Sequence, residues 1–385
     1  MLASLLDNDL YKFTMQQAVL ELYPDIEVEY RFTNRRPSDT FTQAFFDRLH
    51  EEIQRMRELE LSLEELHWVE RTCPFFKPQY LGYLRSYRYD PDEVLLSLND
   101  GHLDLRLIGP WHRTILWEVP LMALISETCF EVDRPEWNDD GQSELARSKA
   151  QRLAEADCRW AEFGTRRRRS YRAQETVLEQ HRDFKPNFVG TSNMHFAHRF
   201  GLKPIGTMAH DWIMALSVLE GLRHANRHAL KAWHQVYRGS LGIALTDTFG
   251  TDAFFEDFDA VLTRQFDGVR HDSGDPFAFL EKTLKHYQSL QVPASTKTII
   301  FTDGLNVDKA IQLREMCADR IRSSFGIGTH FTNDYAGSPA LNIVLKLWSI
   351  NGFPVVKLSD DEGKAQGDAD AIRVARWTFF GTPLD

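Results

Sequence analysis

Hydrophobic positions follow two different rhythms along the chain, and the second begins near residue 160. Before it, residues 10–23 carry apolar side chains at helical spacing, whereas 25–34 and 102–109 alternate between apolar and polar as a half-buried strand does. These elements predict a mixed α/β unit over 1–125. We expect the C-terminal residues 340–385 to complete this domain.

The second rhythm repeats. From about residue 160, short apolar runs end in small or charged residues and are followed by helical patterns, which is typical of parallel strands joined by helices. Such repeats predict an irregular α/β barrel over 126–339. The polar stretch "SDDEGKAQGDAD" (359–370) is predicted to be a surface loop. The runs are "AEFGTRRR" (161–168), "NFVGTSN" (187–193), "KPIGTMAHDW" (203–212), "LGIALTDTFG" (241–250), "FDGVRHDSGDP" (266–276), "TIIFTDGLN" (298–306) and "SSFGIGTHFTND" (323–334).

Composition fits a globular enzyme with a large core. The chain has 385 residues, of which 43% are hydrophobic and 26% charged. Its net charge of −11 argues against a general nucleic-acid binder, whose surface would be basic. Small anionic substrates stay open, because a basic pocket can exist within an acidic protein.

The four cysteines form no CxxC pair, which excludes a zinc ribbon and a dithiol redox motif. Free thiols are typical of reducing compartments, and we therefore expect a cytoplasmic protein. No stretch has 18 consecutive apolar residues, so no membrane span is expected. Asp7 interrupts the place where a signal peptide would need its apolar run.

The residues that could bind a substrate or take part in a reaction lie where the predicted strands end. In a βα barrel, the carboxyl ends of the strands and the loops after them form the active face. Glycines beside Thr or Ser expose backbone N–H groups that suit phosphate oxygens, arginines offer planar forks, and aspartates offer the oxygen ligands that Mg²⁺ prefers. The pattern predicts a site for a phosphorylated sugar or a similar polyanion. The residues are Arg166, Arg167, Thr191, Ser192, Asn193, His210, Asp211, Asp247, Thr248, Arg270, Asp272, Ser273, Gly274, Asp275, Asp303, Gly304, Gly326, Gly328 and Thr329.

Each of these signals has a structural alternative when taken alone. "RRRRS" (166–170) is more often a solvated charge run, "DSGDP" (272–276) is a good turn, and a lone His210 is more often a packed structural residue. The remaining histidines are expected to be structural or solvated. The chain has neither GxxxxGK[ST] nor HExxH, which excludes a P-loop enzyme and a zincin.

An ordered set of motifs resembles one family. "DNDLYKFTM", "EFGTRRRRS", "VGTSN", "PIGTMAHDW", "VRHDSGDP" and "TDGLN" together are similar to nicotinate phosphoribosyltransferases, from residue 7 to about residue 334. The resemblance implies an irregular barrel joined to a sandwich domain. It also implies condensation of nicotinate with 5-phosphoribosyl-1-pyrophosphate, Mg²⁺ as cofactor, and ATP hydrolysis through a transient phosphohistidine.

The resemblance also assigns roles at one end of the site. His210 matches the phosphorylated histidine, and Asp211, Asp247 or Asp272 would orient its ring. Phe163 matches the aromatic residue that stacks on the pyridine ring. Tyr11 matches a second aromatic residue, which in the family reaches in from a neighbouring subunit and implies a homodimer with shared sites.

Further roles concern the substrate's acid group, sugar and phosphates. Arg270 matches the arginine at the acid group, Arg166 one near the base and sugar phosphates, and Asp272 a residue near the ribose and metal. Gly304 and Gly328 resemble phosphate loops. His271 has no assigned role.

Serine at position 192 bears on which base is used. The nicotinamide-using relatives have Asp at the position of Ser192, where it accepts from the amide. Serine can donate to a carboxylate instead, which favours nicotinate.

Three rival functions remain at this point. One is a phosphoribosyltransferase that uses nicotinamide or quinolinate. A second is a barrel lyase or aldolase acting on sugar phosphates, which would need a Schiff-base lysine. Among the strand runs only Lys203 is present, and it lies at a strand start. The third is a non-catalytic binder of nucleotide precursors.

Overall fold

The first of two sheets is antiparallel and joins the two ends of the chain. The computed structural model describes residues 2–361 and 363–381. Its strand order is β11-β10-β1-β3-β2, and Tyr30 of β1 lies opposite Leu347 of β10. The boundaries of the two domains stay a prediction. The strands are β1 (Glu27–Asn34), β2 (Val94–Asn99), β3 (His102–Pro110), β10 (Ile343–Ile350) and β11 (Phe353–Pro354).

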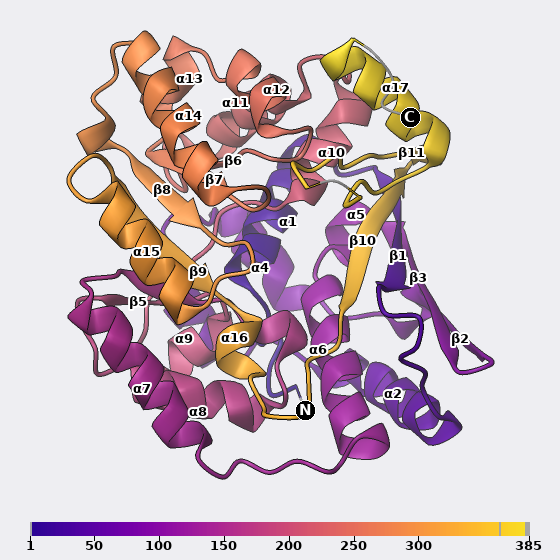
Figure 1. Cartoon of the computed structure of the whole chain (residues 1–385). Coiled ribbons are helices and arrows are strands. Elements are labelled where there is room, and N and C mark those ends of the chain that lie inside the picture. Colours follow the sequence, from indigo (N-terminus) through magenta and orange to yellow (C-terminus); the bar gives the residue numbers. More distant parts are fainter. Residues whose placement is uncertain (1, 362, 382–385) are drawn as a thin grey trace.

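The second sheet is parallel, with the order β5-β4-β9-β8-β7-β6 (Figure 1). Six of the seven predicted apolar runs form its strands, and every neighbouring pair is parallel. The α/β fold class is therefore confirmed. The strands are β4 (Trp160–Glu162), β5 (Phe188–Thr191), β6 (Ile243–Leu245), β7 (Gly268–His271), β8 (Thr298–Phe301) and β9 (Arg322–Ile327).

The seventh run, 203–212, was wrongly predicted to contain a strand. It forms a single bridge at Pro204, and helix α10 (His210–Leu219) begins at the histidine itself. This segment fills the gap between the two edge strands: Ile205 N donates to Thr191 O of β5, and Thr207 Oγ1 donates to Ile243 O of β6. Within the described residues, strand pairing alone does not close the barrel.

Glycine at position 190 allows this close approach. A Cβ on Gly190 would lie 2.0 Å from the Lys203 carbonyl oxygen, which no larger residue tolerates. The backbone of 203–205 therefore runs directly along β5 and carries the chain to His210.

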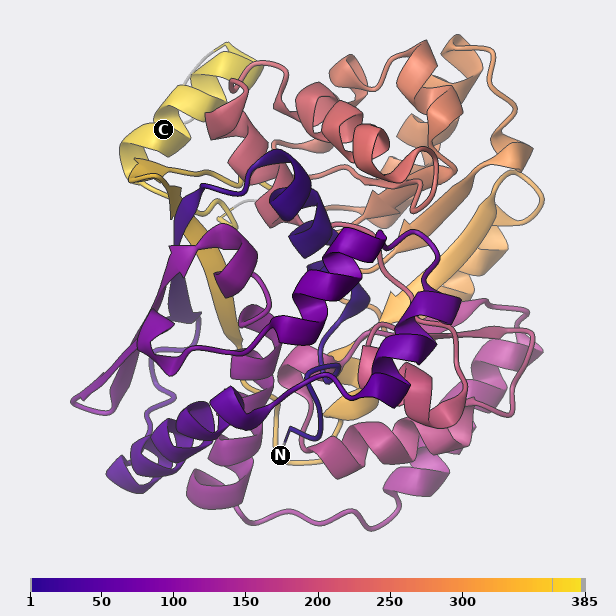
Figure 2. The same cartoon turned by 180° about the vertical axis from the view of Figure 1, so that it is seen from behind.

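Helices cover both sheets and the space between them (Figures 1 and 2). No helix among the described residues is long and apolar enough to cross a membrane. The helices not yet named are α1 (Leu10–Leu22), α2 (Gln43–Arg55), α3 (Leu63–Thr72), α4 (Pro78–Ser86), α5 (Trp111–Thr114), α6 (Glu118–Thr128), α7 (Gln142–Glu155), α8 (Tyr171–His181), α9 (Met194–Phe200), α11 (Ala225–Tyr237), α12 (Thr251–Asp257), α13 (Ala260–Gln265), α14 (Pro276–Ser289), α15 (Val307–Cys317), α16 (Thr329–Thr332) and α17 (Ala369–Phe380).

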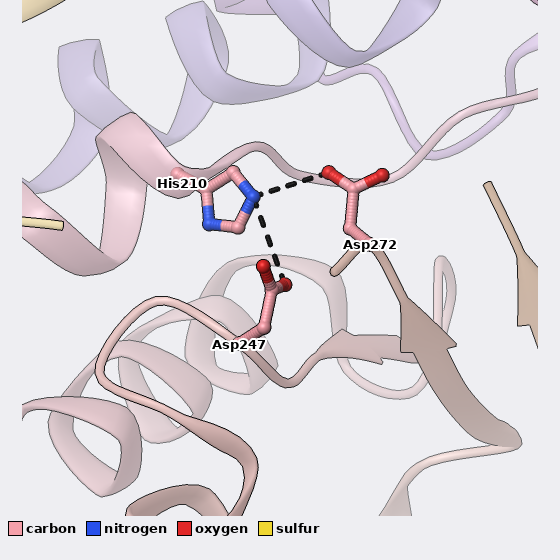
Figure 3. A group of neighbouring side chains, drawn as sticks. All are labelled: His210, Asp247 and Asp272. Atoms are coloured by element: carbon pink, nitrogen blue, oxygen red, sulfur yellow. Dashed lines mark hydrogen bonds and ion pairs between the residues drawn. The ribbon is translucent and has the colours of Figure 1, made fainter. Parts of the chain in front are cut away.

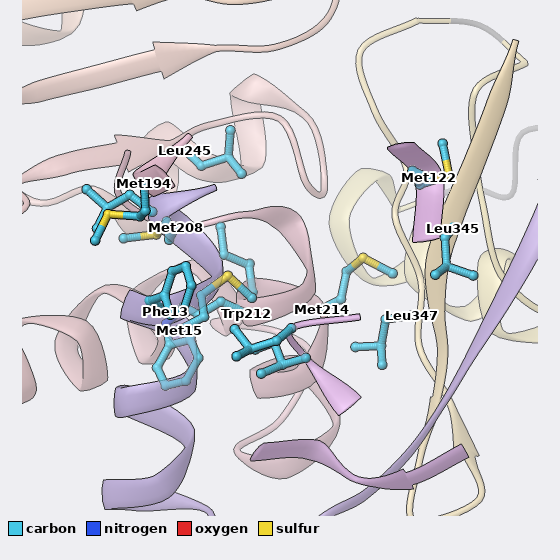
Figure 4. Packing of buried hydrophobic residues seen from close by; sticks show 14 of the residues in the cluster. Phe13, Met15, Met122, Met194, Met208, Trp212, Met214, Leu245, Leu345 and Leu347 are labelled. Atoms are coloured by element: carbon cyan, nitrogen blue, oxygen red, sulfur yellow. The ribbon is translucent and has the colours of Figure 1, made fainter. Parts of the chain in front are cut away.

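The core between the sheets is built from α1, α6 and α10. Phe13 and Met15 of α1 pack near Trp212 of α10, and Met214 extends the contact toward Leu347 of β10 (Figure 4). All of these side chains are buried. Burial of this apolar area holds the start of α1 and the start of α10 in fixed positions, and both starts carry residues of the site described next.

Candidate active site

A cavity of about 1180 Å³ opens where the parallel strands end. It brings together most of the residues predicted from the strand ends, although they come from distant parts of the chain. Thr191 and Asp247 lie behind its wall rather than on it. The predicted residues on the wall are Tyr11, Phe163, Arg166, Ser192, His210, Arg270, Asp272, Ser273, Asp303, Gly304, Gly326, Gly328 and Thr329.

His210 stands between two carboxylates (Figure 3). Its Nε2 lies 3.1 Å from Asp272 Oδ2 and 3.7 Å from Asp247 Oδ1, while Nδ1 lies 3.0 Å from Thr248 Oγ1. The two aspartates follow β7 and β6, so neighbouring parallel strands deliver both to one imidazole. The ring faces the cavity, as the spacing of the strand ends predicts.

The charges around His210 favour a neutral ring and an ionised Asp272. Burial, with the nearby Lys357 ammonium, lowers the pKa of His210, although Asp247 and Asp272 oppose this. Burial alone would raise the pKa of Asp272, but Arg270 and His210 hold it well below its usual range. A neutral imidazole keeps a lone pair, which makes it a nucleophile.

Lys357 is a member of this group that sequence reasoning missed. Its Nζ lies 3.0 Å from His210 Nε2 and 3.1 Å from Asp247 Oδ2. It follows β11, far along the chain from any strand of the parallel sheet. Only the antiparallel sheet, which includes the C-terminal segment, brings it to the cavity, and no local motif marks it.

Asp211 does not orient His210, although it is the next residue. It pairs instead with the fully buried Lys12 of α1, at 2.9 Å. Adjacent residues at the start of a helix point about 100° apart, which sends the two side chains in different directions. Lys12 also pairs with Glu118 of α6, and Arg166 Nη1 lies 3.3 Å from Glu118 Oε1. Although burial opposes it, these cations lower the pKa of Glu118 to about 2.

Two aromatic residues line the other end of the cavity. Phe163 follows β4 and lies against Gly326 of β9, where a Cβ would come within 2.5 Å of its ring. Gly326 is therefore needed to seat the aromatic ring. Tyr11 lines the cavity of its own chain, where Lys12 and the amide of Leu10, which donates to Ser192 O, anchor the start of α1. Its contribution to the site of a neighbouring subunit stays a prediction.

Polar side chains behind the aromatic end are tied together. Ser192 Oγ donates to Asp9 Oδ1 at 2.8 Å, and Thr191 Oγ1 donates to Glu162 Oε2 at 2.6 Å. Glu162 also accepts from the amide of Gly164, which fixes the turn after Phe163. Burial raises the pKa of Glu162 to about 7, although its hydrogen bonds oppose the shift. Asp9 and Glu162 were not predicted as site residues.

The arginine run is not a solvated surface. Arg168 is fully buried and binds both oxygens of Asp7, at 2.8 and 3.0 Å. Arg169 is also buried and stacks on Phe130, with its guanidinium carbon 3.5 Å from the ring centre. Arg166 and Arg167 line the cavity. Two of the four arginines thus hold the loop, and two present charge to the site.

Arg270 and His271 are neighbours on β7 with different environments. Arg270 Nη2 lies 3.3 Å from Asp272 Oδ2, and its buried Nε has no protein partner within the described part of the chain. His271 points away into the core between Phe279 and Phe301. Burial lowers the pKa of His271. The residue left unassigned by the sequence is a core residue.

The cavity is locally basic within an acidic protein. Nine Lys or Arg side chains line it, against six carboxylates. Three of the lysines, Lys346, Lys357 and Lys364, come from the C-terminal segment. The segment 359–370, which was predicted to be a surface loop, also forms part of the cavity, because Ser359, Lys364 and Gln366 lie on its wall. The argument that a lyase would find no lysine in the site therefore fails, since it considered strand ends alone.

Family models match nearly the whole chain. One, for the nicotinate phosphoribosyltransferase (NAPRTase) family, matches residues 158–382, and a second, for the N-terminal domain of the same family, matches residues 6–126. The chain belongs to the nicotinate phosphoribosyltransferase family. This assignment, rather than the absence of a lysine, removes the lyase alternative.

Relatives and solved structures agree with the family assignment. A nicotinate phosphoribosyltransferase of Methanosarcina acetivorans is 48% identical over the full length of both chains, and one of Desulforapulum autotrophicum is 47% identical over 97% of each. The crystal structure of a nicotinate phosphoribosyltransferase from Porphyromonas gingivalis has a TM-score of 0.95 at 39% identity. It covers 98% of this chain and 100% of its own.

Proposed function

We propose that this chain condenses nicotinate with 5-phosphoribosyl-1-pyrophosphate to give nicotinate mononucleotide and pyrophosphate. The observation that carries the proposal is a basic cavity lined by two aromatic side chains and by His210, whose ring lies beside Asp272. In this assignment Phe163 and Tyr11 enclose the pyridine ring, and Arg270 binds the carboxylate with its planar fork.

The reaction is a substitution at the anomeric carbon of the ribose. The bond to the pyrophosphate oxygen breaks, that oxygen leaves with the electron pair, and the pyridine nitrogen supplies the new bond. Positive charge develops on the sugar, and negative charge on the leaving group. Arg166, Lys346 and Lys357 line the cavity and are suited to stabilise the leaving pyrophosphate, so catalysis rests on positioning and charge.

ATP hydrolysis is assigned to His210. A hydrogen on Nδ1 can be donated to Thr248, which leaves on Nε2 a lone pair that accepts from the Lys357 ammonium and for which the ATP phosphate would compete. Nε2 would attack the terminal phosphorus of ATP, and the bond to the bridging oxygen breaks as ADP leaves. Asp247 and Asp272 would stabilise the cationic phosphohistidine, and water would later return the histidine and phosphate.

Mg²⁺ fits this cavity as a partner of substrate phosphates. His210, Asp247 and Asp272 offer atoms within 4.8 Å of one another, which is the spacing of a metal site. The Lys357 ammonium, however, already lies beside His210 and Asp247. We therefore assign the metal-facing role to Asp272, whose ionised carboxylate lines the cavity. The ion would neutralise charge on the pyrophosphate.

A homodimer and a cytoplasmic location remain proposals. Four buried free cysteines support a reducing compartment. Light scattering of the purified protein would give the number of chains, and a change of that number with dilution would show how strongly they associate.

Product analysis tests the proposed function. The protein is incubated with phosphoribosyl pyrophosphate, ATP and one base, with and without Mg²⁺. Nicotinate should give its mononucleotide and pyrophosphate, with a much higher kcat/KM than nicotinamide or quinolinate. Preference for one of the other two bases would contradict the assignment, as would an absence of pyrophosphate release.

A further inference from the structure

Asp9 is a carboxylate whose placement the reaction does not explain. It is 2% exposed and stands immediately before α1, where an aspartate usually caps the helix with its side chain. Asp9 makes no such cap. Its carboxylate turns to Ser192 instead and accepts the hydroxyl hydrogen bond at 2.8 Å.

The backbone holds this pair in place. Leu10 N donates to Ser192 O at 2.8 Å, and Asp9 forms an antiparallel bridge with Asn193. Both Asp9 and Ser192 lie on the cavity wall beside the aromatic end. The contact is therefore part of the frame of the base site, not a chance meeting of two mobile side chains.

The pair presents the wrong hydrogen-bonding character to nicotinate. A serine hydroxyl has one hydrogen, and Ser192 already uses it on Asp9. Toward the cavity the serine then offers only lone pairs, and the ionised Asp9 adds a negative charge. The carboxylate of nicotinate is itself an acceptor only. Serine at position 192 does not by itself provide the donor that the sequence comparison with nicotinamide-using enzymes suggested.

We propose that Asp9 takes up one proton from solution when nicotinate binds, so that Asp9 donates to Ser192 and Ser192 donates to the nicotinate carboxylate. This inference rests on the proposed function. The proton forms an O–H bond on Asp9, the hydroxyl of Ser192 rotates, and no other bond changes. The substrate's negative charge is balanced by that proton, and Arg270 remains available to the second oxygen of the acid group.

The surroundings of Asp9 are consistent with such a change. Burial raises its pKa, and the neighbouring Glu118 adds to this, whereas Ser192, Arg166 and Thr165 lower it. Glu162 of β4 and Tyr11 of α1 also lie close enough to interact with the charge of Asp9. A second anion beside a carboxylate raises its pKa further, so the approach of nicotinate favours protonation of Asp9.

The same device would discriminate between the acid and the amide. Nicotinamide carries an N–H₂ group, which can donate to the pair while Asp9 stays ionised, so its binding needs no proton. A fall in pH should therefore increase the preference for nicotinate over nicotinamide. Asp9 acts here through Ser192 and is a specificity-determining residue rather than a catalytic one.

Calorimetry of the full chain tests the proposal directly. Nicotinate is titrated in phosphate and in Tris, whose ionisation enthalpies differ, at about pH 8, where the free site is ionised. The difference in heat should correspond to uptake of close to one proton per nicotinate. Binding or turnover without proton uptake would overturn the inference and leave the proposed function standing. No binding and no turnover of nicotinate would reject the function itself.

Two variants and one control locate the proton. Asp9→Asn carries a permanent donor toward Ser192, so proton uptake should vanish. The fall in kcat/KM for nicotinate with rising pH, about tenfold per pH unit in the parent, should flatten. Ser192→Ala should also lose the uptake and bind nicotinate about ten- to a hundredfold more weakly. Asp104→Asn, at an exposed carboxylate of β3, should keep the uptake. Uptake that persists in both Asp9→Asn and Ser192→Ala would overturn the proposal.

Discussion

His210 and Asp211 are consecutive residues at the start of α10, yet they belong to two ion groups of opposite character. The Asp211 group, with Lys12 and Glu118, is buried and its charges are paired within the protein. Asp211 and Glu118 reach the cavity wall, but Lys12, their shared partner, does not line it. All three members of the His210 group, His210, Asp272 and Lys357, line the cavity. Removing a partner from the first leaves an unpaired buried charge, whereas the second has atoms free to meet a ligand.

The difference indicates that the burial and pairing of a charged side chain distinguish a structural role from a chemical one more reliably than its residue type does. The first group contains a lysine and two carboxylates. The second contains a lysine, a histidine and the carboxylate of Asp272. Only the second group includes a side chain, His210, whose pKa is shifted in the direction that keeps it nucleophilic. Four predictions separate the two groups, beginning with the largest effect.

His210→Ala should lower ATP hydrolysis by at least about a thousandfold, because the phosphoryl acceptor is lost. Slow synthesis of the mononucleotide without ATP should persist. Steady-state ATPase and product assays measure both activities. The matched control is His102→Ala, at an exposed histidine of β3, which should leave them unchanged. Intact ATPase in the His210 variant would refute its role.

Lys12→Met should lower the free energy of unfolding by about 3–5 kcal/mol, because Asp211 would stay buried without its cation and Glu118 would keep only the longer pair with Arg166. Urea unfolding measures the change. Lys77→Met removes an exposed pair with Glu21 and should cost at most about 1 kcal/mol. Equal losses in the two variants would mean that the buried group is not structural.

Lys357→Met should slow ATP hydrolysis by about tenfold or more, since the lysine lies beside His210 on the cavity wall. The ammonium lowers the pKa of His210, so the acid side of the pH profile should move to higher pH in the variant. Lys282→Met, at an exposed lysine, serves as the control. A shift to lower pH would show that Lys357 acts in another way.

The smallest effect is the pH dependence of the parent protein. Burial and Lys357 lower the pKa of His210, so its ring stays neutral to a more acidic pH than an ordinary histidine does. ATP hydrolysis should therefore persist below about pH 6.5 and decline only on further acidification. A rate that already falls above that pH would contradict the charge balance described for the ring.

Sequence patterns predicted the residues whose position follows from one strand. Arg270 and Asp272 follow directly from the end of β7, and Phe163 from the end of β4. The pattern went wrong at 203–212, where small residues and Pro204 imitate a strand end but make one bridge only. Of the three aspartates predicted as candidates to orient His210, Asp247 and Asp272 lie beside the ring, whereas Asp211 does not.

Residues that reach the site through contacts between distant segments of the chain cannot be recognised from the sequence around them. Asp9 reaches the site because α1 docks on the loop after β5, and Lys357 because β10 pairs with β1 across the length of the chain. Neither contact follows from spacing or periodicity. The type of element and the strand-end residues were therefore predictable, whereas the ion partners that tune them were not.

Phosphohistidine mapping tests the central claim most directly. The protein is incubated with ATP labelled at the terminal phosphate, without nicotinate, and its peptides are analysed under alkaline conditions that preserve phosphohistidine. The account predicts an acid-labile phosphoryl group on His210, which is absent from His210→Ala. Label at another residue, or ATP turnover with no label on His210 at any time, would contradict the account.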